Sequence, residues 1–441
     1  MKAQKQKQLD SLFGKLNADK QFYGNVLIAE KGKILYQKSF GKANAATGET
    51  LNAESVFELA SVSKQFTAMG ILLLQKEGKL RLEDSLRNYF PELPYSGITV
   101  KHLLQHTSGL PDYMNLMLSK GNVNTIMTNA DMIALLAKHK PKRNFVPGEK
   151  WEYSNTGYAL LASIIEQVSG RSFGDYLAAS VFGPLKMKNT FVYRRRFENR
   201  VVNNYAYGYV MNPKTKEYVL PDSLLMTAKM VYCLDGITGD GTVNSTTGDL
   251  LKWDRALYTE KLISKEMLAA AFTPGMLNNG KAHHYGYGWA IGEFQNRKII
   301  NHSGGWPGYA TFIERHTETD KTIIILSNYE SEAPAAEVRN ILYGIIPEVK
   351  KEVQLTDDVL KQYEGVYELQ KNFVLKVTLD GSRLFVQATG QEKFEMFAEK
   401  KDLFFLKEVE AGLEFVRNEK NEIIAVILNQ DGMKTEAKKI K

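Results

Sequence analysis

Cysteine is almost absent from this 441-residue chain, and its single copy, Cys233, excludes any internal disulfide. Long apolar runs are absent as well. The most apolar stretches, residues 69–74 and 159–165, are far shorter than the ~20 residues that a bilayer-spanning helix needs. The formal net charge is +7, but the lysines are scattered and no dense basic run with interleaved aromatic residues occurs. We therefore expect no integral membrane segment and no nucleic-acid partner.

Metal-binding patterns are also missing. The seven histidines include one adjacent pair, His283 and His284, but no cysteine or carboxylate accompanies them at the spacing of a zinc site. We predict no metal and no other cofactor. Residues 1–7 carry charge and lack the apolar core of a secretory signal, so no leader peptide is visible in this chain.

The sequence does contain an ordinary globular composition, with 44% hydrophobic and 24% charged residues, and enough length for two or three structural units. Residues 24–40 are typical of a hairpin with its turn at Lys31 and Gly32. Helical periodicity dominates from residue 61 to about residue 257, and strand patterns return afterwards. Those strands are expected at residues 287–291, 298–300, 311–314 and 322–326, followed by a helix over residues 335–345.

Strands at both ends of a helical middle predict one α/β (α+β) domain over residues 1–350. The returning C-terminal strands would complete its antiparallel sheet, and a helical sub-domain of about residues 61–270 would be inserted between them. We expect the functional site in the cleft between sheet and sub-domain, because such boundaries often hold ligands.

The pattern changes after residue 350. Eight short strand-like segments follow one another, separated by turns. They are expected at residues 364–369, 373–379, 383–388, 393–398, 403–406, 413–417, 423–428 and 433–438. Eight strands at hairpin spacing predict a small antiparallel up-and-down β-barrel over residues 351–441. Such a barrel holds packed side chains or one small ligand, so a bracing role is expected and a binding role is the alternative.

A hydroxyl nucleophile and a base lie three residues apart at the start of a helical pattern. The helix expected after Ser61 has apolar residues on one face, and Gly78 stands where a C-terminal glycine cap belongs. Lys64 lies one turn along from Ser61, so its amine can reach the serine hydroxyl. The alternative is an N-cap serine beside a solvated lysine, because residues 39–42 repeat the Ser-x-x-Lys spacing.

A Tyr-Ser-Asn motif begins at Tyr153 and ends at Asn155. It follows a Pro-Gly turn and precedes an amphipathic run, which places it in a tight loop before a helix. Loops held between packed elements can expose a reactive side chain and still fix it. The motif is weak alone, because residues 113–115 repeat the Tyr-x-Asn spacing.

A His-Ser-Gly-Gly segment begins at His302. We expect His302 to end the short strand over residues 298–300, and the two glycines to let a substrate approach the backbone closely. Gly305 could then donate its N–H group to an oxyanion. Residues 284–286 repeat the His-x-Gly spacing, so this motif too is weak alone.

Taken in this order, the motifs resemble those of the serine β-lactamase and penicillin-binding protein superfamily. The branch is the one that holds class C β-lactamases, DD-carboxypeptidases, D-aminopeptidases and related esterases. The segments at residues 57–60, 103–111 and 285–289 fit the same family. The resemblance covers roughly residues 10–346, and the C-terminal strands resemble the lipocalin-like module attached to some of these hydrolases.

The resemblance implies chemistry through an acyl-enzyme. Ser61 would be the acylated nucleophile and Lys64 its proton-accepting or field-supplying neighbour. Tyr153 would pass a proton to the leaving group, and which of Lys64 and Tyr153 is the base stays open. The backbone N–H groups of Ser61 and Gly305 would form the oxyanion hole.

The resemblance also implies the substrate contacts. Asn155 would bind the amide carbonyl of the substrate, and Ser303 would contact a substrate carboxylate, with His302 and Gly304 beside it. His302 occupies the position at which classical β-lactamases of the superfamily carry lysine. Because histidine is charged only part of the time near neutral pH, this change favours a peptidase over an efficient β-lactamase.

The function expected is therefore a serine hydrolase for a small molecule or short peptide, first of all a DD-carboxypeptidase or a D-amino-acid peptidase or amidase. A small-ester esterase and a β-lactamase are the enzymatic alternatives, and a penicillin-binding sensor or ligand-binding module is the non-enzymatic one. Family members usually work outside the cytoplasm, so a periplasmic or secreted location is expected, with a cytoplasmic one as the alternative.

Overall fold

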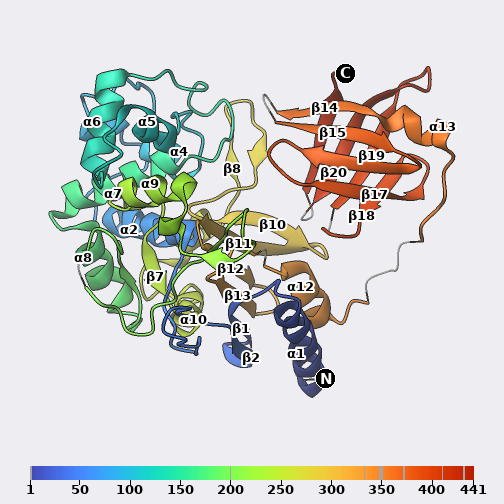
Figure 1. Ribbon diagram of the computed structural model, residues 1–441. Helices are drawn as coiled ribbons and strands as arrows, with labels where there is room; N and C mark the ends of the chain where they lie inside the picture. Colours follow the sequence, from blue (N-terminus) through green and yellow to red (C-terminus); the bar gives the residue numbers. More distant parts are fainter. Residues whose placement is uncertain are drawn as a thin grey trace. The chain divides into compact units, whose positions relative to one another are not determined.

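Figure 1 presents the computed structural model of the chain, which describes residues 2–198, 200–331, 333–346, 351–370, 373–409, 411–430 and 433–441. The chain divides into two compact units, Met1–Ala333 and Pro334–Lys441. The expected division into residues 1–350 and 351–441 stays a prediction. Within the described residues, no helix combines the length and the apolar character that crossing a bilayer requires.

A six-stranded antiparallel sheet forms the frame of the first unit, as the sequence predicts. The N-terminal hairpin joins strands that come almost three hundred residues later, through the pairing of β1 with β13. The sheet order is β10-β11-β12-β13-β1-β2, with β1 (Gly24–Glu30), β2 (Lys33–Phe40), β10 (Ala290–Phe294), β11 (Arg297–Trp306), β12 (Tyr309–His316) and β13 (Lys321–Ser327).

Local sequence explains the N-terminal hairpin. Lys31 and Gly32 both have a positive φ, 51° and 70°, which is the backbone conformation of the two-residue turn that matches the strand twist. The predicted hairpin is therefore confirmed at its turn.

The predictions for two strands of this sheet, β10 and β11, need correction. β10 starts at Ala290 instead of residue 287, because Gly288 has a φ of 77° and the N–H of Gly286 bonds the carbonyl of Trp289 in a tight turn. β11 does not end near residue 300. It pairs with β12 from residue 300 to residue 306, so the ladder overrides the weak strand propensity of its glycines and His302 lies within the strand.

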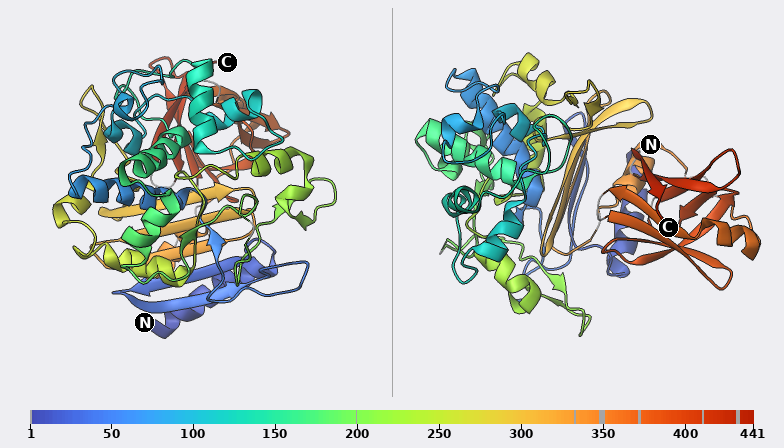
Figure 2. Two further views of the ribbon diagram at one scale, coloured as in Figure 1. Left: turned by 90° about the vertical axis from the view of Figure 1, so that its left-hand side faces the viewer. Right: turned by 90° about the horizontal axis from the view of Figure 1, so that it is seen from above.

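The helices of the first unit gather mainly on one face of the sheet, whereas α1 lies on the other face (Figure 2). α1 packs against β2, and α10 packs against β1 and β13. The helices are α1 (Lys2–Ala18), α2 (Lys64–Lys76), α3 (Leu86–Tyr89), α4 (Val100–Leu104), α5 (Tyr113–Lys120), α6 (Asn129–His139), α7 (Asn155–Ser169), α8 (Phe173–Leu177), α9 (Leu225–Cys233), α10 (Thr247–Ala256) and α11 (Lys265–Ala271).

Short strands complete this unit. β3 (Phe57–Glu58), β7 (Val243–Ser245) and β4 (Phe191–Val192) form a three-stranded sheet that leads into α2. Two further pairs lie elsewhere, β5 (Val210–Met211) with β6 (Tyr218–Val219) and β8 (Gly275–Met276) with β9 (Ala282–His283).

Helix α2 occupies the middle of the apolar core, since eleven of its thirteen residues are buried. It packs against α7, and the contact is close at Gly70, where an added Cβ atom would lie 2.8 Å from the Cδ1 atom of Ile165. Gly78 follows α2 with a φ of 69°, so the predicted glycine cap is confirmed. A helix packed on all sides holds its first turn rigidly, and that turn carries Lys64.

The second unit contains the predicted eight-stranded antiparallel β-barrel, closed by the pairing of β14 with β21. Aromatic rings of Tyr363, Tyr367, Phe404 and Phe415 fill its core, with centroids 4.7 to 5.6 Å apart. Residues 431–432, between the last two of the expected strands, lie outside the described residues. The elements are α12 (Ala335–Tyr343), α13 (Asp357–Leu360), β14 (Gly365–Gln370), β15 (Phe373–Asp380), β16 (Arg383–Ala388), β17 (Lys393–Lys400), β18 (Leu403–Leu406), β19 (Ala411–Arg417), β20 (Ile423–Gln430) and β21 (Met433–Lys439).

Candidate active site

The Ser-x-x-Lys tetrad lies where a short 3₁₀ helix (Ala60–Ser63) runs into α2. The side chain of Lys64 is buried, and its Nζ atom lies 3.1 Å from the Oγ atom of Ser61. The same Nζ atom lies 2.8 Å from Oδ1 of Asn155 and 2.9 Å from the backbone oxygen of Asp240. Lys64 is therefore not solvated, and three oxygens surround its amine.

The backbone beside Ser61 is tightly constrained. Ala60 has a φ of 47°, a left-handed conformation that residues with a side chain seldom adopt. Gly304 of β11 packs against this segment, because a Cβ atom there would lie 2.4 Å from the carbonyl oxygen of Leu59. Gly304 is thus required by the packing of the segment from Leu59 to Ser61. Gly305 differs, since a Cβ atom there would meet nothing within 4 Å.

The Tyr-Ser-Asn motif lies in a loop that ends at the first residue of α7, as predicted. Ser154 caps this helix by accepting a hydrogen bond from the N–H of Gly157 at 3.2 Å. Asn155 begins the helix and contacts Lys64. Tyr153 remains 38% exposed, and the centre of its ring lies 4.9 Å from the Lys64 Nζ atom. The tyrosine thus lies at the open side of the lysine.

His106 is a site residue that the motif analysis missed. Its carbonyl oxygen accepts a hydrogen bond from the N–H of Glu152 at 2.9 Å, and its Nδ1 atom accepts one from the N–H of Ser154 at 3.0 Å. Its ring packs 4.3 Å from the ring of Tyr153. Burial, helped by the charge of Lys64, holds the pKa of His106 well below its usual value. The neutral His106 therefore binds the backbone N–H groups of both chain neighbours of Tyr153, Glu152 and Ser154.

His302 is buried in β11, where both ring nitrogens are engaged. Nδ1 donates to the carbonyl oxygen of Ser303 at 2.6 Å, so Nε2 is the nitrogen that accepts from the hydroxyl of Tyr285 at 2.7 Å. Burial, followed by the charge of Lys64, lowers the pKa of His302 to about 3. The expectation of partial charge near neutral pH is corrected, because this imidazole stays neutral there.

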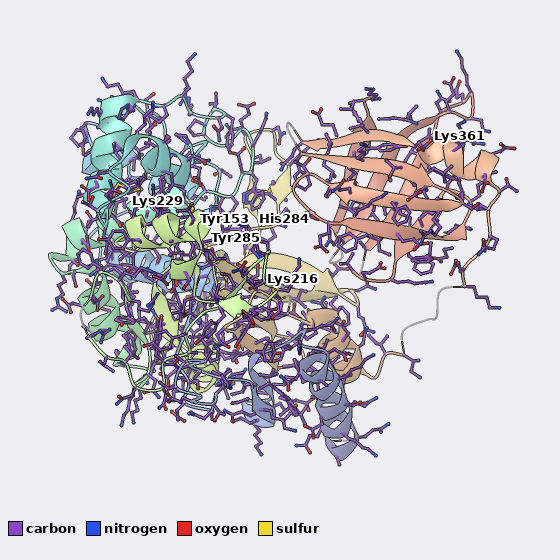
Figure 3. All side chains as sticks on the ribbon, in the orientation of Figure 1. Tyr153, Lys216, Lys229, His284, Tyr285 and Lys361 are labelled. Atoms are coloured by element: carbon purple, nitrogen blue, oxygen red, sulfur yellow. The ribbon has the colours of Figure 1, made fainter. Side chains whose placement is uncertain are left out.

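Tyr285 comes from the segment that repeats the His-x-Gly spacing, and sequence reasoning gave it no role in the site. It is buried, and burial beside Tyr158 raises its pKa well above the usual tyrosine value, so it keeps its proton. Figure 3 labels Tyr285 close to Tyr153 and His284, and the rings of Tyr285 and Tyr153 meet edge to face at 6.4 Å. Its hydroxyl orients His302.

A pocket opens beside Ser61. Its lining includes Ser61, Asn155, Gly305 and Trp306, together with Tyr113 and Met114 from the segment that repeats the Tyr-x-Asn spacing. Three carboxylate residues also line it, and the sequence gave no reason to choose them. They are Glu58, Asp235 and Asp240.

The predicted site residues thus occupy one region of the first unit. Hydrogen bonds join Ser61, Lys64 and Asn155, whereas Tyr153 and His302 approach through their rings, whose centroids are 6.2 Å apart. Ser303 lies exposed on β11. Among the described residues, no group of three or more histidine, cysteine or acidic side chains is placed to hold a metal ion.

A hydroxyl that contacts a buried lysine, at the junction of an antiparallel sheet and a helical region, defines the class of the serine β-lactamases and penicillin-binding proteins. The chain belongs to the β-lactamase family, which matches residues 9–346. Residues 349–439 match a domain of unknown function (DUF3471). The resemblance stated from the motifs is therefore confirmed.

Relatives cover the whole length of the chain. Penicillin-binding protein 4* of Bacillus subtilis (strain 168) is 42% identical over 100% of both chains. The octameric penicillin-binding protein homologue of Pyrococcus abyssi has a TM-score of 0.68 and 26% identity, covering 98% of this chain and 99% of that one. The D-amino acid amidase of Ochrobactrum anthropi SV3 shares the fold, with a TM-score of 0.62, 23% identity and coverage of 78% and 98%.

Proposed function

We propose that the protein is a serine hydrolase that forms an acyl-enzyme at Ser61 and cleaves an amide or peptide bond next to a D-amino acid. The contact between Lys64 and Ser61 carries this proposal, because a serine hydroxyl attacks a carbonyl only when a nearby group takes its proton. The relative named penicillin-binding protein 4* supports a site that accepts penicillin-like molecules, and the name of the fold neighbour, D-amino acid amidase, is the reason for choosing a D-amino acid.

The surroundings of Lys64 suit proton transfer from Ser61. Asn155 Oδ1 and the Asp240 carbonyl oxygen can only accept, so they take two N–H groups from the amine whether it is charged or neutral. The third direction points to the Ser61 hydroxyl, which can donate to a neutral amine or accept from an ammonium. The proton can therefore move from Ser61 to Lys64 without any change in the other contacts, which favours Lys64 as the base.

The remaining roles follow the position of each group. Tyr153 lies at the open side of Lys64 and would pass a proton to the departing amine. The N–H groups of Ser61 and Gly305, two residues that line the same pocket, would bind the oxyanion. Asn155 would orient the substrate amide, and the exposed Ser303 hydroxyl, beside His302 and Gly304, would contact the leaving group.

The neutral state of His302 supports a peptidase or amidase over an efficient β-lactamase. A charged lysine at this position would attract the carboxylate of a β-lactam, whereas this imidazole has no charge near neutral pH and is bonded to Tyr285. A small-ester esterase remains the second enzymatic candidate. The location outside the cytoplasm also stays a prediction.

Intact-protein mass spectrometry tests the proposal. Incubation with a penicillin and with an activated small ester should add the acyl mass to the wild-type protein and not to Ser61→Ala. Ser39→Ala is the matched control, because Ser39 belongs to the repeated Ser-x-x-Lys spacing on β2, and this variant should still form the adduct. Absence of both adduct and turnover, with short D-amino-acid amides included, would refute the proposal.

A further inference from the structure

The pocket beside Ser61 is lined by acidic side chains. Glu58, Asp235 and Asp240 line it, and its described lining contains no lysine, arginine or histidine. Because Ser61 and Gly305 belong to the same lining, a molecule whose carbonyl lies at Ser61 can place its acyl part in this pocket.

Two of the three carboxylates already have partners. Asp235 accepts from the backbone N–H groups of Arg196 and Phe197 and from the guanidinium of Arg196 at 3.2 Å. Asp240 accepts a hydrogen bond from the hydroxyl of Tyr113 at 2.9 Å.

Glu58 differs from both. Within the described part of the chain, no hydrogen bond or ion pair engages its carboxylate. It ends β3, three residues before Ser61, and also lines an adjoining hollow with Trp306. Glu58 therefore borders two hollows.

The surrounding charges leave this carboxylate unmatched. The cations near it are Arg195 and Arg196, but both guanidinium groups bind Asp222, and Lys64 is bound by its three oxygens. Five carboxylates thus face three cationic side chains in this part of the first unit. They are Glu58, Asp112, Asp222, Asp235 and Asp240 against Lys64, Arg195 and Arg196.

We propose that this pocket selects substrates whose acyl part carries an ammonium group close to the reacting carbonyl, and that Glu58 binds that group. This inference rests on the proposed function, since it concerns the substrate of the Ser61 acyl-enzyme. It identifies the substrate as a D-aminoacyl amide or a peptide with a free N-terminal amine.

The ionisation of Glu58 gives this selection a pH dependence. Burial, with Asp235 and Asp240 nearby, raises the pKa of Glu58 to about 7, against the opposing effect of Arg195 and Arg196. The buried phenols of Tyr205 and Tyr309 also face it, and both stay protonated because their pKa values are raised. A free α-amine loses its proton near pH 8. The preference for an amine should therefore be greatest between about pH 7 and pH 8 and should fall toward pH 6.

The test compares two probes that differ in one group. D-alanine p-nitroanilide carries an ammonium where isobutyric acid p-nitroanilide carries a methyl group of similar size. In the wild-type protein at pH 7.5, kcat/KM should be at least about tenfold higher for the D-alanine probe, because a hydrogen bond between charged groups contributes at least that much discrimination. In Glu58→Gln the ratio should fall to near one, and in the control Glu54→Gln it should not change.

The pH dependence of the same ratio in the wild-type protein needs no variant and should show a loss toward pH 6. A wild-type ratio near or below one, with both probes hydrolysed, would overturn this inference and leave the acyl-enzyme proposal intact. A ratio that Glu58→Gln leaves unchanged in a folded protein would also overturn it. Absence of any Ser61 adduct, in contrast, would refute the proposed function itself and this inference with it.

Discussion

Two basic side chains lie near Ser61, and the fold places them in opposite surroundings. Lys64 is buried with three oxygens around its amine. His302 is also buried, but its imidazole lies between one carbonyl and the hydroxyl of Tyr285, and its pKa is lowered to about 3. A buried amine can carry charge only if oxygens replace the lost water, and a buried imidazole without such a set stays neutral.

The difference separates the two sides of the site. On the side of Ser61, the contacts of the Lys64 amine suit the proton acceptor that we propose. On the other side, the neutral His302 of β11 forms hydrogen bonds but carries no charge. Catalytic power should therefore depend steeply on Lys64 and its immediate neighbours, whereas His302 should set which substrates are accepted.

Removal of the Lys64 amine should have the largest effect. Lys64→Met keeps most of the side-chain volume and deletes the group next to the Ser61 hydroxyl, so the acylation rate should fall at least about a thousandfold. Lys76→Met is the matched control, since Lys76 belongs to the same helix and bonds the carbonyl oxygen of Leu262. Stopped-flow acylation with an activated ester measures both. A loss below tenfold in Lys64→Met would contradict the assignment of the base to Lys64.

Removal of the His106 side chain should have the next largest effect on the rate. His106→Ala removes the acceptor for the Ser154 N–H and the ring under Tyr153, and misplacement of a catalytic group by about 1 Å costs about a hundredfold in rate. His106→Asn should recover most of kcat, because asparagine tolerates a φ of 58° and its side-chain oxygen can accept the same N–H.

The two His106 variants separate positioning from stability. If both unfold at the wild-type temperature and only the alanine variant loses kcat, His106 positions Tyr153. Equal losses of kcat and thermal stability in the two variants would indicate a purely structural histidine instead.

The sequence predicted well those features that depend on local patterns. The eight barrel strands, the N-terminal hairpin and the cap at Gly78 follow from alternation and turn residues within a few positions. The grouping of Ser61, Tyr153 and His302 came from the order of three motifs and their resemblance to a family.

The missed residues depend on contacts across the fold. His106 and Tyr285 bear on the site through rings and backbone groups that lie far away in the sequence. Glu58 and Asp240 meet at the site only in the folded chain, because β3 and the segment before β7 border one pocket. Two spacings treated as repeats of the motifs, at residues 113–115 and 284–286, contribute Tyr113 and Tyr285 to the site. Spacing alone did not separate them from chance.

The neutral state of His302 should also make the stability of the protein depend on pH. A native pKa near 3 lies below the ordinary histidine value of about 6.5, so the unfolded chain binds more protons and stability is lost as the pH falls below 6.5. At pH 5 this loss should be about 2 kcal/mol for His302. Glu58, with its raised pKa, works in the opposite direction, so the wild-type curve alone does not isolate the histidine.

The variant His302→Asn isolates it. Its side-chain amide can still donate to the carbonyl of Ser303 but does not titrate. Urea unfolding at pH 7.5 and pH 5 should show a loss of stability on acidification that is smaller by about 2 kcal/mol in this variant. Equal losses in the two proteins would mean that His302 is protonated in the native state.

A cation placed at position 302 should have the smallest effect and the most direct bearing on the comparison. His302→Lys would bring an ammonium to the side of the site that now lacks charge, and a charged hydrogen bond to a substrate carboxylate contributes about 1.5 kcal/mol, or about tenfold. We expect kcat/KM for a penicillin to rise by about that factor, and His302→Met, which removes the imidazole without adding charge, to show no rise. An increase in both variants would mean that the imidazole obstructs the penicillin, and an increase in neither would show that charge at β11 does not separate this site from a β-lactamase.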